Sequence, residues 1–589
     1  MTYYHVSFDN QLTFYLQIQL VVAVPADAAA PLALQLSAWR PGRYELQNFA
    51  QKIQRVEASD ADTDAPLPCY KTTKDRWEVP GAAGRAVRVR YRFYAHQLDA
   101  GGSWLDETQL YLNPVQALLY AVGHETEACQ LTLALPAGWR VACGLPQSEP
   151  NVLPAASFDQ LADSPLIASP ALQHEQYAAG GVAFHVWAQG DEAVLDWPRL
   201  LVDFEAFSKA QLDLFGSFPG DGGGPGSATS PEFHFLNQFV SGAYYHGVEH
   251  AASTVIVLGP ASQLMQESLY KELLGVSCHE LFHVWNVKAI RPAEMRPYDY
   301  ARENYFSTCY VAEGLTTYYG EYLLCRARIR TPAQYLDELN TVLRRHFADA
   351  GGDNLSLADA STDLWLDGYR PGVPDRKVSV YHKGALVALL LDLTIRQLHQ
   401  HQRSLDDVLR QLYQEFGQPS QAQQPGYTAA DYARVVTEVA GRDMKRYFDQ
   451  FIHGTAPLVE PLSRALVGVG CELVALENPA EAERAFGLRV TAKADRTSVA
   501  YCWPGSPAEA VLSVDDEILA VNGRRETPNP LLLFAENLPA YELTVLRQGR
   551  LRTVTLRAEP GRLFGAVYEV QRRAAATAEQ QAGFEKWLG

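Results

Sequence analysis

The sequence predicts a multidomain α+β protein, with an antiparallel β domain first, a mainly helical region in the middle and a small β-rich domain near the C-terminal end. Three observations support this fold class. The chain has 589 residues, which is too many for one hydrophobic core. Apolar and polar residues alternate in much of residues 1–190, whereas helical spacing prevails from about 264 to 455. Short alternating runs return after Gly454.

The first domain, expected over residues 1–190, shows the period of two that half-buried strands require. Residues 16–20, 87–93 and 131–135 each alternate apolar with polar side chains. Strands with one buried and one wet face are typical of antiparallel sheets and sandwiches. We therefore expect a sandwich-like β domain here.

The second domain is expected over residues 191–462. Its first helix is predicted at 197–215, followed by a surface loop in the glycine-rich stretch 220–227. Short strands are predicted at 233–240 and 254–258.

Three helix starts in this region have recognisable capping residues. Thr331 precedes Pro332, and proline is favoured in the first turn of a helix. Ser404 and Thr428 each begin a capping box in which aspartate, three residues on, replaces the usual glutamate.

A third domain is expected over residues 463–560, a common domain size. Its predicted strands include 487–490, 516–523 and 541–546. The Ala/Glu/Gln-rich tail, 561–589, is predicted to end in a helix.

Composition restricts the classes of partner. With 50 Lys plus Arg and 68 Asp plus Glu, the formal net charge is −18, which disfavours nucleic acid and anionic lipid as main partners. The first residues lack a basic segment followed by an apolar one, and no apolar run reaches the ~18 residues of a membrane span. The eight cysteines are scattered. We expect a cytoplasmic protein with reduced thiols, without nucleic-acid or membrane partners.

A metal-binding pattern lies in His279-Glu280-Leu281-Phe282-His283. Histidines four apart on a helix lie on one face, so both imidazoles can bind one ion. Glu280 lies beside them, where it can act as a general base on a water molecule. The alternative is a helix whose two histidines satisfy local hydrogen bonds. Zinc is preferred over other divalent ions because of the ligand types.

A catalytic zinc ion needs a third protein ligand and one open position. Glu313 is the best candidate, because it is a lone acid in an apolar and aromatic helical stretch, where an unpaired carboxylate is costly to bury. Glu321 competes for the role but also suits a solvated helix face. Cys278 is interpreted as a core cysteine, since it precedes His279 by one residue and points elsewhere.

The chain resembles the glycyl aminopeptidase family of gluzincin zinc metallopeptidases. The resemblance rests on Trp39-Arg40-Pro41-Gly42-Arg43-Tyr44, on the metal helix with its continuation through Pro292, and on Glu303-Asn304-Tyr305 before Glu313-Gly314. Ala289 replaces the usual arginine, and Cys309-Tyr310 stands where Leu-Trp is expected. The resemblance implies an N-terminal β domain, a thermolysin-like, mainly helical catalytic domain and a C-terminal PDZ domain.

Two further segments are similar to elements of related aminopeptidases. Gly247-Val248-Glu249-His250 resembles a substrate-binding strand whose glutamate binds the free α-amino group, and Tyr245 just before it is a candidate for narrowing the first side-chain pocket. Tyr381-His382-Lys383-Gly384-Ala385 resembles an element whose tyrosine stabilises the oxyanion. The alternatives are an ion pair of Glu249 with an arginine, and a tyrosine that only caps the following helix.

The PDZ resemblance rests on Gly505-Ser506-Pro507-Ala508 and on residues 516–523, with Asp515 in place of the usual glycine. PDZ domains bind peptide ends as an added strand. A PDZ fold used only for packing against the catalytic domain is the alternative.

Together these features predict an aminopeptidase with one zinc ion that removes N-terminal Gly or Ala from peptides with a free amino end. Two rival functions stay open. One is a zinc endopeptidase guided by PDZ binding of peptide ends. The other is a catalytically silent, PDZ-bearing binding protein.

Overall fold

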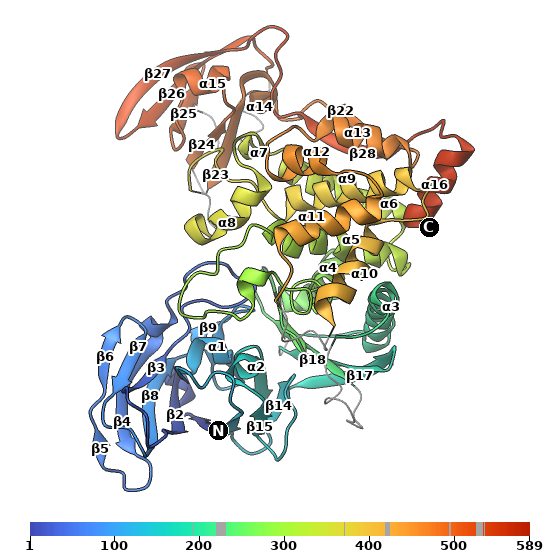
Figure 1. Ribbon diagram of the computed structural model, residues 1–589. Coiled ribbons are helices and arrows are strands. Elements are labelled where there is room, and N and C mark those ends of the chain that lie inside the picture. The colour runs from blue at the N-terminus through green and yellow to red at the C-terminus, as the bar shows by residue number, and fades with distance from the viewer. Residues whose placement is uncertain are drawn as a thin grey trace.

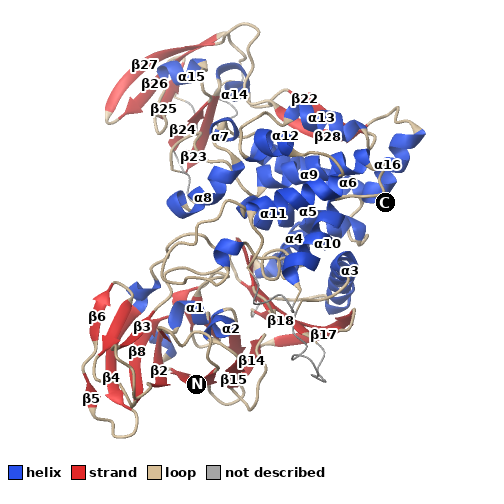
Figure 2. Ribbon diagram, viewed as in Figure 1, coloured by secondary structure: helices blue, strands red, loops and turns tan. Residues whose placement is uncertain are grey.

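The computed structural model describes residues 1–190, 193–219, 231–369, 372–418, 425–493, 496–525, 534 and 536–589. The predicted loop at 220–227 lies outside these residues. Figure 1 shows the N-terminal β domain and a C-terminal sheet at two ends of a helical region, and Figure 2 shows how strands and helices separate between them. The predicted multidomain α+β fold is confirmed at this level.

Residues 2–169 form three sheets, of orders β15-β13-β1-β2-β8-β4-β5, β14-β16-β11-β10-β9 and β12-β3-β7-β6. The predicted strands at 16–20 and 87–93 lie in β2 and β8, which pair antiparallel, and that at 131–135 overlaps β13. β1 and β13 are a parallel pair. The elements are β1 (Thr2–Ser7), β2 (Tyr15–Ala23), β3 (Leu32–Gln35), β4 (Ile53–Asp60), β5 (Pro66–Leu67), β6 (Tyr70–Thr73), β7 (Arg76–Val79), β8 (Ala86–Tyr94), β9 (His96–Gln97), β10 (Ser103–Leu105), β11 (Leu110–Leu112), α1 (Pro114–Ala117), β12 (Tyr120–Ala121), β13 (Cys129–Leu133), β14 (Arg140–Cys143), β15 (Val152–Ala155), α2 (Phe158–Ala162) and β16 (Leu166–Ser169).

A fourth sheet, of order β17-β18-β19-β21-β20, supports the helical region. β18, β19 and β21 are parallel neighbours, and β20 pairs antiparallel with β21 at the edge. β17 and β18 lie within the span expected for the first domain but pair into this sheet. The strands are β17 (Gln173–Ala179), β18 (Val182–Gln189), β19 (Glu232–Phe239), β20 (Tyr244–Glu249) and β21 (Ser253–Gly259).

Helices dominate between residues 267 and 467, in agreement with the helical region predicted over about 264–455. The capping boxes at Ser404 and Thr428 form as expected, each with its aspartate bonding back to the cap, and Thr331 begins the helix that has Pro332 in its first turn. The helices are α3 (Trp197–Phe215), α4 (Glu267–Phe282), α5 (Leu315–Arg326), α6 (Pro332–His346), α7 (Gly351–Asn354), α8 (Leu357–Asp367), α9 (His382–Leu398), α10 (Leu405–Leu412), α11 (Ala429–Ala440), α12 (Lys445–Tyr447) and α13 (Val459–Val467).

The C-terminal sheet has the order β23-β24-β25-β26-β27. In the sequence it lies between β22 and β28, two strands that pair with each other. The chain thus leaves the helical region and returns to it side by side, and α16 then packs on α5. The elements are β22 (Cys471–Leu476), α14 (Glu481–Phe486), β23 (Leu488–Lys493), β24 (Arg496–Cys502), α15 (Pro507–Val511), β25 (Glu517–Val521), β26 (Ala540–Arg547), β27 (Arg550–Arg557), β28 (Val567–Arg572) and α16 (Ala578–Leu588).

Among the described residues, no helix has the length and apolarity needed to cross a bilayer.

Candidate metal centre

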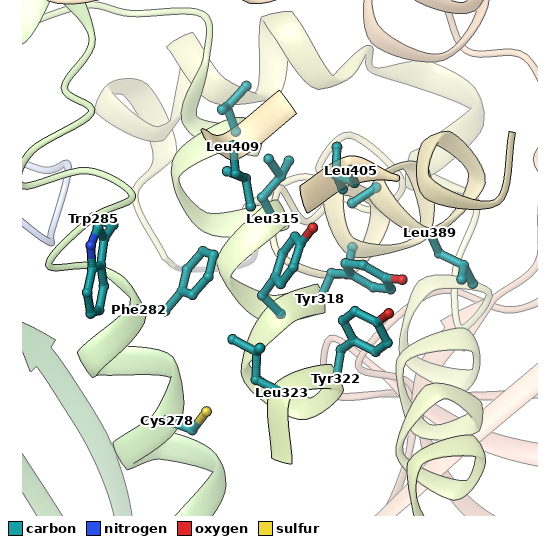
Figure 3. Packing of buried hydrophobic residues seen from close by; sticks show 14 of the residues in the cluster. Cys278, Phe282, Trp285, Leu315, Tyr318, Tyr322, Leu323, Leu389, Leu405 and Leu409 are labelled. Atoms are coloured by element: carbon teal, nitrogen blue, oxygen red, sulfur yellow. The ribbon is translucent and has the colours of Figure 1, made fainter. Parts of the chain in front are cut away.

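The helix α4 carries the two histidines toward the centre of the molecule. Its apolar side packs against α5, where Phe282 stacks on Tyr319 with ring centroids 5.0 Å apart. Figure 3 shows Phe282 and Cys278 in this core. Cys278 lies in this core, and Gln211 donates hydrogen bonds to its carbonyl oxygen and sulfur. The interpretation of Cys278 as a core cysteine agrees with this position. The opposite side of α4 is left for His279 and Glu280.

His279, His283 and Glu313 converge on one point. The two histidine Nε2 atoms are 3.2 Å apart, and Glu313 Oε2 lies 3.7 Å from that of His279 and 3.4 Å from that of His283. Two ligands of a tetrahedral zinc ion, each about 2.0–2.1 Å from the metal, are separated by roughly 3.3–3.5 Å. The three donor atoms therefore fit a zinc ion.

A backbone contact fixes the orientation of His283. Its Nδ1 donates to the carbonyl oxygen of Asn286 at 2.9 Å, so in the neutral imidazole Nε2 is the nitrogen with a lone pair for a metal. The Asn286 side chain donates to the carbonyl oxygens of Val311 and Ala312 and to the Thr316 hydroxyl. Asn286 thus ties the histidine helix to the segment that carries Glu313. This role of Asn286 was not predicted, although Asn286 lies in the continuation of the metal helix that the sequence analysis compared with the family motif.

Glu313 lies in a π-helical turn, Tyr310–Gly314, which leads directly into α5. π-Helical turns are rare in proteins as a whole, but those that occur are often found at functional sites. Gly314 packs backbone to backbone against Gly384, so a Cβ on either residue would overlap the other glycine. The competitor, Glu321, instead pairs with Arg330.

The edge strand β20 lies against Glu280, the candidate for the general base. A Cβ at Gly247 would overlap Glu280 Oε1, so only glycine leaves room for this carboxylate. Glu249, two residues on, shares the face of Gly247, and its carboxylate lies within 4.8 Å of the donor atoms of Glu280 and His283. Tyr245 belongs to the same face and is 57% exposed.

The N-terminal domain contributes the loop that contains Arg40 and Gly42. The sequence analysis noted this segment only as part of a family motif and gave it no role in the site. Gly42 has φ +77°, and a Cβ there would overlap the Glu249 carboxylate. Arg40 is 2% exposed, fits over Gly101 and lies close enough to Glu280 to lower its pKa. No local pattern in the sequence distinguishes such a buried arginine from a surface one.

Three buried carboxylates, those of Glu249, Glu280 and Glu313, are 4%, 6% and 3% exposed. Burial raises the pKa of Glu280 well above its ordinary value, and the two other glutamates add to this. Burial also raises the pKa of Glu313, but His283 and His279 outweigh it and lower that pKa to about 2. Burial lowers the pKa of His283, yet the surrounding acids raise it to about 10.

These shifts have one meaning, namely that the cluster attracts positive charge. Glu280 Oε2 is buried and has no hydrogen-bond partner among the described residues. An unpaired buried carboxylate is costly. A divalent cation held by His279, His283 and Glu313 would take the place of the proton on His283.

Tyr381 comes from the other side, at the start of α9. It is partly buried against the helical core, and Tyr369 is its hydrogen-bonding neighbour. Burial raises the pKa of Tyr381, and Glu313 raises it further. The start of α9 meets the segment that carries Glu313 where Gly384 packs against Gly314. A phenol with a raised pKa stays protonated and can donate. Tyr369 was not predicted, because nothing in its local sequence links it to the site.

A second group, His185, Glu232 and His234, also brings donor atoms within 4.8 Å. Trp187 Nε1 donates to His234 Nδ1 at 3.1 Å, so the proton of neutral His234 is on Nε2, the atom that faces Glu232 at 3.7 Å. That nitrogen has no lone pair for an ion. The arrangement therefore favours a polar contact of the His234 Nε2–H with Glu232 over a metal site.

Residues 3–170 match the family model described as the peptidase M61 N-terminal domain, and residues 272–387 match that of M61 glycyl aminopeptidase. The whole chain is similar to the whole of an aminopeptidase N family protein from Idiomarina loihiensis, with TM-score 0.87 and 24% identity.

An M1 zinc metallopeptidase from Deinococcus radiodurans, solved with a Tyr-Ser-Ala substrate, is similar at TM-score 0.47 and 15% identity, covering 78% of this chain and 95% of its own. No curated protein matches the chain in sequence.

The fold and the site together define a metallopeptidase. Two segments of the chain, residues 3–170 and 272–387, match the models of the two peptidase M61 domains.

Proposed function

We propose that the protein is a zinc-dependent aminopeptidase that removes small N-terminal residues, Gly or Ala, from peptides. One observation carries the proposal: the Glu249 carboxylate lies on the edge strand beside Glu280 and His283. A carboxylate at this distance from the metal site can bind a free α-amino group one residue from the bond to be cleaved. Only the first peptide bond then reaches the metal.

Charge balance supports this assignment. When ionised, the carboxylates of Glu249, Glu280 and Glu313 bring three negative charges into a buried space, where the buried Arg40 supplies one positive charge. A divalent ion and the ammonium group of a peptide would supply the remaining positive charge. Buried charges are tolerated when they are paired in this way. A substrate with a blocked amino end would leave one carboxylate without a partner.

Each side chain has a role in the proposed reaction. Bound zinc would polarise the scissile carbonyl and acidify a water molecule. Glu280 takes the proton from the attacking water and delivers it to the leaving amine. Tyr381 donates a hydrogen bond to the developing oxyanion, which typically contributes roughly 3 kcal/mol. Tyr245, on the face shared by Gly247 and Glu249, borders the first side chain of the substrate.

The architecture is proposed to be that of a gluzincin, with a thermolysin-like catalytic domain over residues 191–462. The C-terminal region, 463–560, is proposed to be a PDZ domain that binds a peptide end. In the part of the chain that is described, β23 pairs only with β24 and so offers an edge for an added strand.

The test compares glycine p-nitroanilide with its N-acetylated form, with and without a chelator. We expect chelator-sensitive hydrolysis of the free amine alone. Glu249→Gln should lower kcat/KM for the free amine by about 30- to 1,000-fold, as expected when one member of a buried charged pair is removed. Equal turnover of the acetylated compound by the parent protein would instead favour an endopeptidase.

A further inference from the structure

A cavity of about 530 Å³ lies between the helical region and the C-terminal sheet. Its volume is within the range of peptide- and ligand-binding pockets. Arg345, Tyr381 and His382 line it on the catalytic side. Arg489 and Tyr501 close it from strands β23 and β24. The cavity therefore exists only because the C-terminal sheet is docked on the catalytic helices.

This cavity borders the segment that carries the metal ligand Glu313. Val380 lines the cavity and lies against Gly314, the residue after Glu313, and the proposed oxyanion donor Tyr381 lines it as well. Glu249 lies against Gly42 of the N-terminal domain, and neither residue is among those that line the cavity. If Glu249 binds the amino end of a peptide, the chain beyond the scissile bond must leave the metal centre away from Glu249. The way past Tyr381 leads into the cavity.

Most charged groups in the cavity wall already have partners. Lys377 pairs with Asp367 at 2.9 Å, Arg489 pairs with Glu483, and the Tyr501 hydroxyl donates to Asp375. The charges of Lys377 and Arg489 are thus neutralised by ion pairs within the protein, whereas the Asp375 carboxylate accepts hydrogen bonds from the Tyr501 hydroxyl and the backbone N–H of Ala350.

Arg345 differs from these groups. It is exposed at the end of α6, and no hydrogen bond or ion pair with another described residue engages its guanidinium. Arg345 and His382 both line the cavity, at the end of α6 and the start of α9. The positive charge of Arg345 adds to burial in lowering the pKa of His382.

We propose that this cavity holds the part of the substrate beyond the scissile bond and that Arg345 binds its C-terminal carboxylate, so that the enzyme acts preferentially on short peptides with both ends free. Arginine binds carboxylates through two parallel hydrogen bonds, which suits a fixed chain end. This inference rests on the proposed aminopeptidase function and names its substrate class.

The test compares a Gly-Ala-Ala series of increasing length, each peptide with a free and with an amidated C-terminus. For the parent protein we expect a lower KM for the free acids at a few residues and no difference for long peptides. Arg345→Gln should raise KM for the short free acids about 10- to 100-fold, as charged hydrogen bonds predict. The amides and glycine p-nitroanilide, which has no carboxylate, should be unaffected. Arg345→Lys should recover part of the loss.

Arg344→Gln is the matched control, because Arg344 is the neighbouring exposed arginine but pairs with Glu569 outside the cavity wall. Equal effects of Arg345→Gln on acids and amides, or none on either, would overturn the inference while glycine p-nitroanilide is still hydrolysed. If no nitroanilide is hydrolysed, the proposed function itself fails. In that case, calorimetry on the parent protein compares its affinities for the free-acid and the amidated tripeptide. Equal affinities would overturn the inference about Arg345.

Discussion

At the scale of single residues, Glu280 is placed to move protons and not to hold the metal. It lies next to His279 in the sequence, yet Glu313 is the carboxylate nearest both Nε2 atoms. Burial raises the pKa of Glu280, which brings it closer to the range useful for a general base. Its carboxylate contacts the backbone of the edge strand at Gly247.

Glu280→Gln should therefore separate metal binding from turnover. We expect the metal content to stay near one ion per chain while kcat falls by about 10²- to 10⁴-fold, the contribution typical of a general base. Metal analysis and nitroanilide turnover on the same sample measure both. Normal turnover in this variant would exclude Glu280 as the base.

At the scale of elements, β20 is the strand that aligns substrate and base. Gly247→Ala should displace the Glu280 carboxylate, because the added Cβ would overlap Oε1. We expect a kcat loss of at least about tenfold with little change in melting temperature, since misplacement near 1 Å can cost roughly 10²-fold. Gly242→Ala is the control, because a Cβ there meets no atom within 4 Å. Equal activities of the two variants would contradict this role of Gly247.

Sequence reasoning reached the parts of the site that depend on local spacing. His279 and His283 are one helical turn apart, and Glu313 is conspicuous as a lone acid in an apolar stretch. Arg40, Gly42 and Tyr369 were not assigned, because their positions depend on how distant segments pack. The proximity of Gly314 to Gly384 is likewise invisible in the sequence, although both residues stood in quoted motifs.

A buried ion pair between Asp163 and Lys288 joins the N-terminal domain to the catalytic region. Asp163, in the N-terminal domain, accepts from Lys288 Nζ at 2.8 Å and from the backbone N–H of Ala251, and contacts His250 Nδ1 at 3.0 Å. Burial opposes ionisation of Asp163, but Lys288 and His250 hold its pKa well below the ordinary value. The pair joins β20 and the end of the metal helix to the first domain.

Asp163→Asn should destabilise the protein by about 3–5 kcal/mol at pH 7, because Lys288 is left buried without its partner. A depressed pKa stabilises the fold above the unfolded value of about 3.9, and this stabilisation is lost as the pH falls through the folded pKa. The deficit should therefore shrink below about pH 4. Denaturant unfolding at pH 7 and pH 3 measures it, with exposed Asp27→Asn as the control. A deficit independent of pH would contradict the electrostatic explanation.

At the scale of the whole molecule, the last helix fastens the chain end to the catalytic core. Trp587 is buried, its Nε1 donates to the Tyr318 hydroxyl at 3.2 Å, and its carbonyl oxygen accepts from Tyr322 at 2.8 Å. Tyr318 and Tyr322 lie on α5, which follows Glu313 directly (Figure 3). The end of the sequence therefore supports the helix that positions a metal ligand.

Trp587→Ala should cost about 3–5 kcal/mol, the range for removing a buried tryptophan side chain. Thermal unfolding measures this loss, and metal affinity should fall with it because α5 loses its support. Glu585→Ala, on the exposed side of the same helix, should change neither quantity. Unchanged stability of the tryptophan variant would show that α16 is not part of the folded core.

The paired strands β22 and β28 also restrict how the C-terminal sheet can move. A domain on a single tether can swing in any direction, whereas this one is attached at two adjacent points that are hydrogen-bonded to each other. Two paired strands restrict the directions in which the sheet can rotate more than a single tether would. Hydrogen bonds from Arg489 to Ala348 and from Tyr501 to Asp375 hold the same sheet against the helical region beside the cavity. If the cavity holds the peptide as proposed, these contacts must be kept or broken together whenever its width changes.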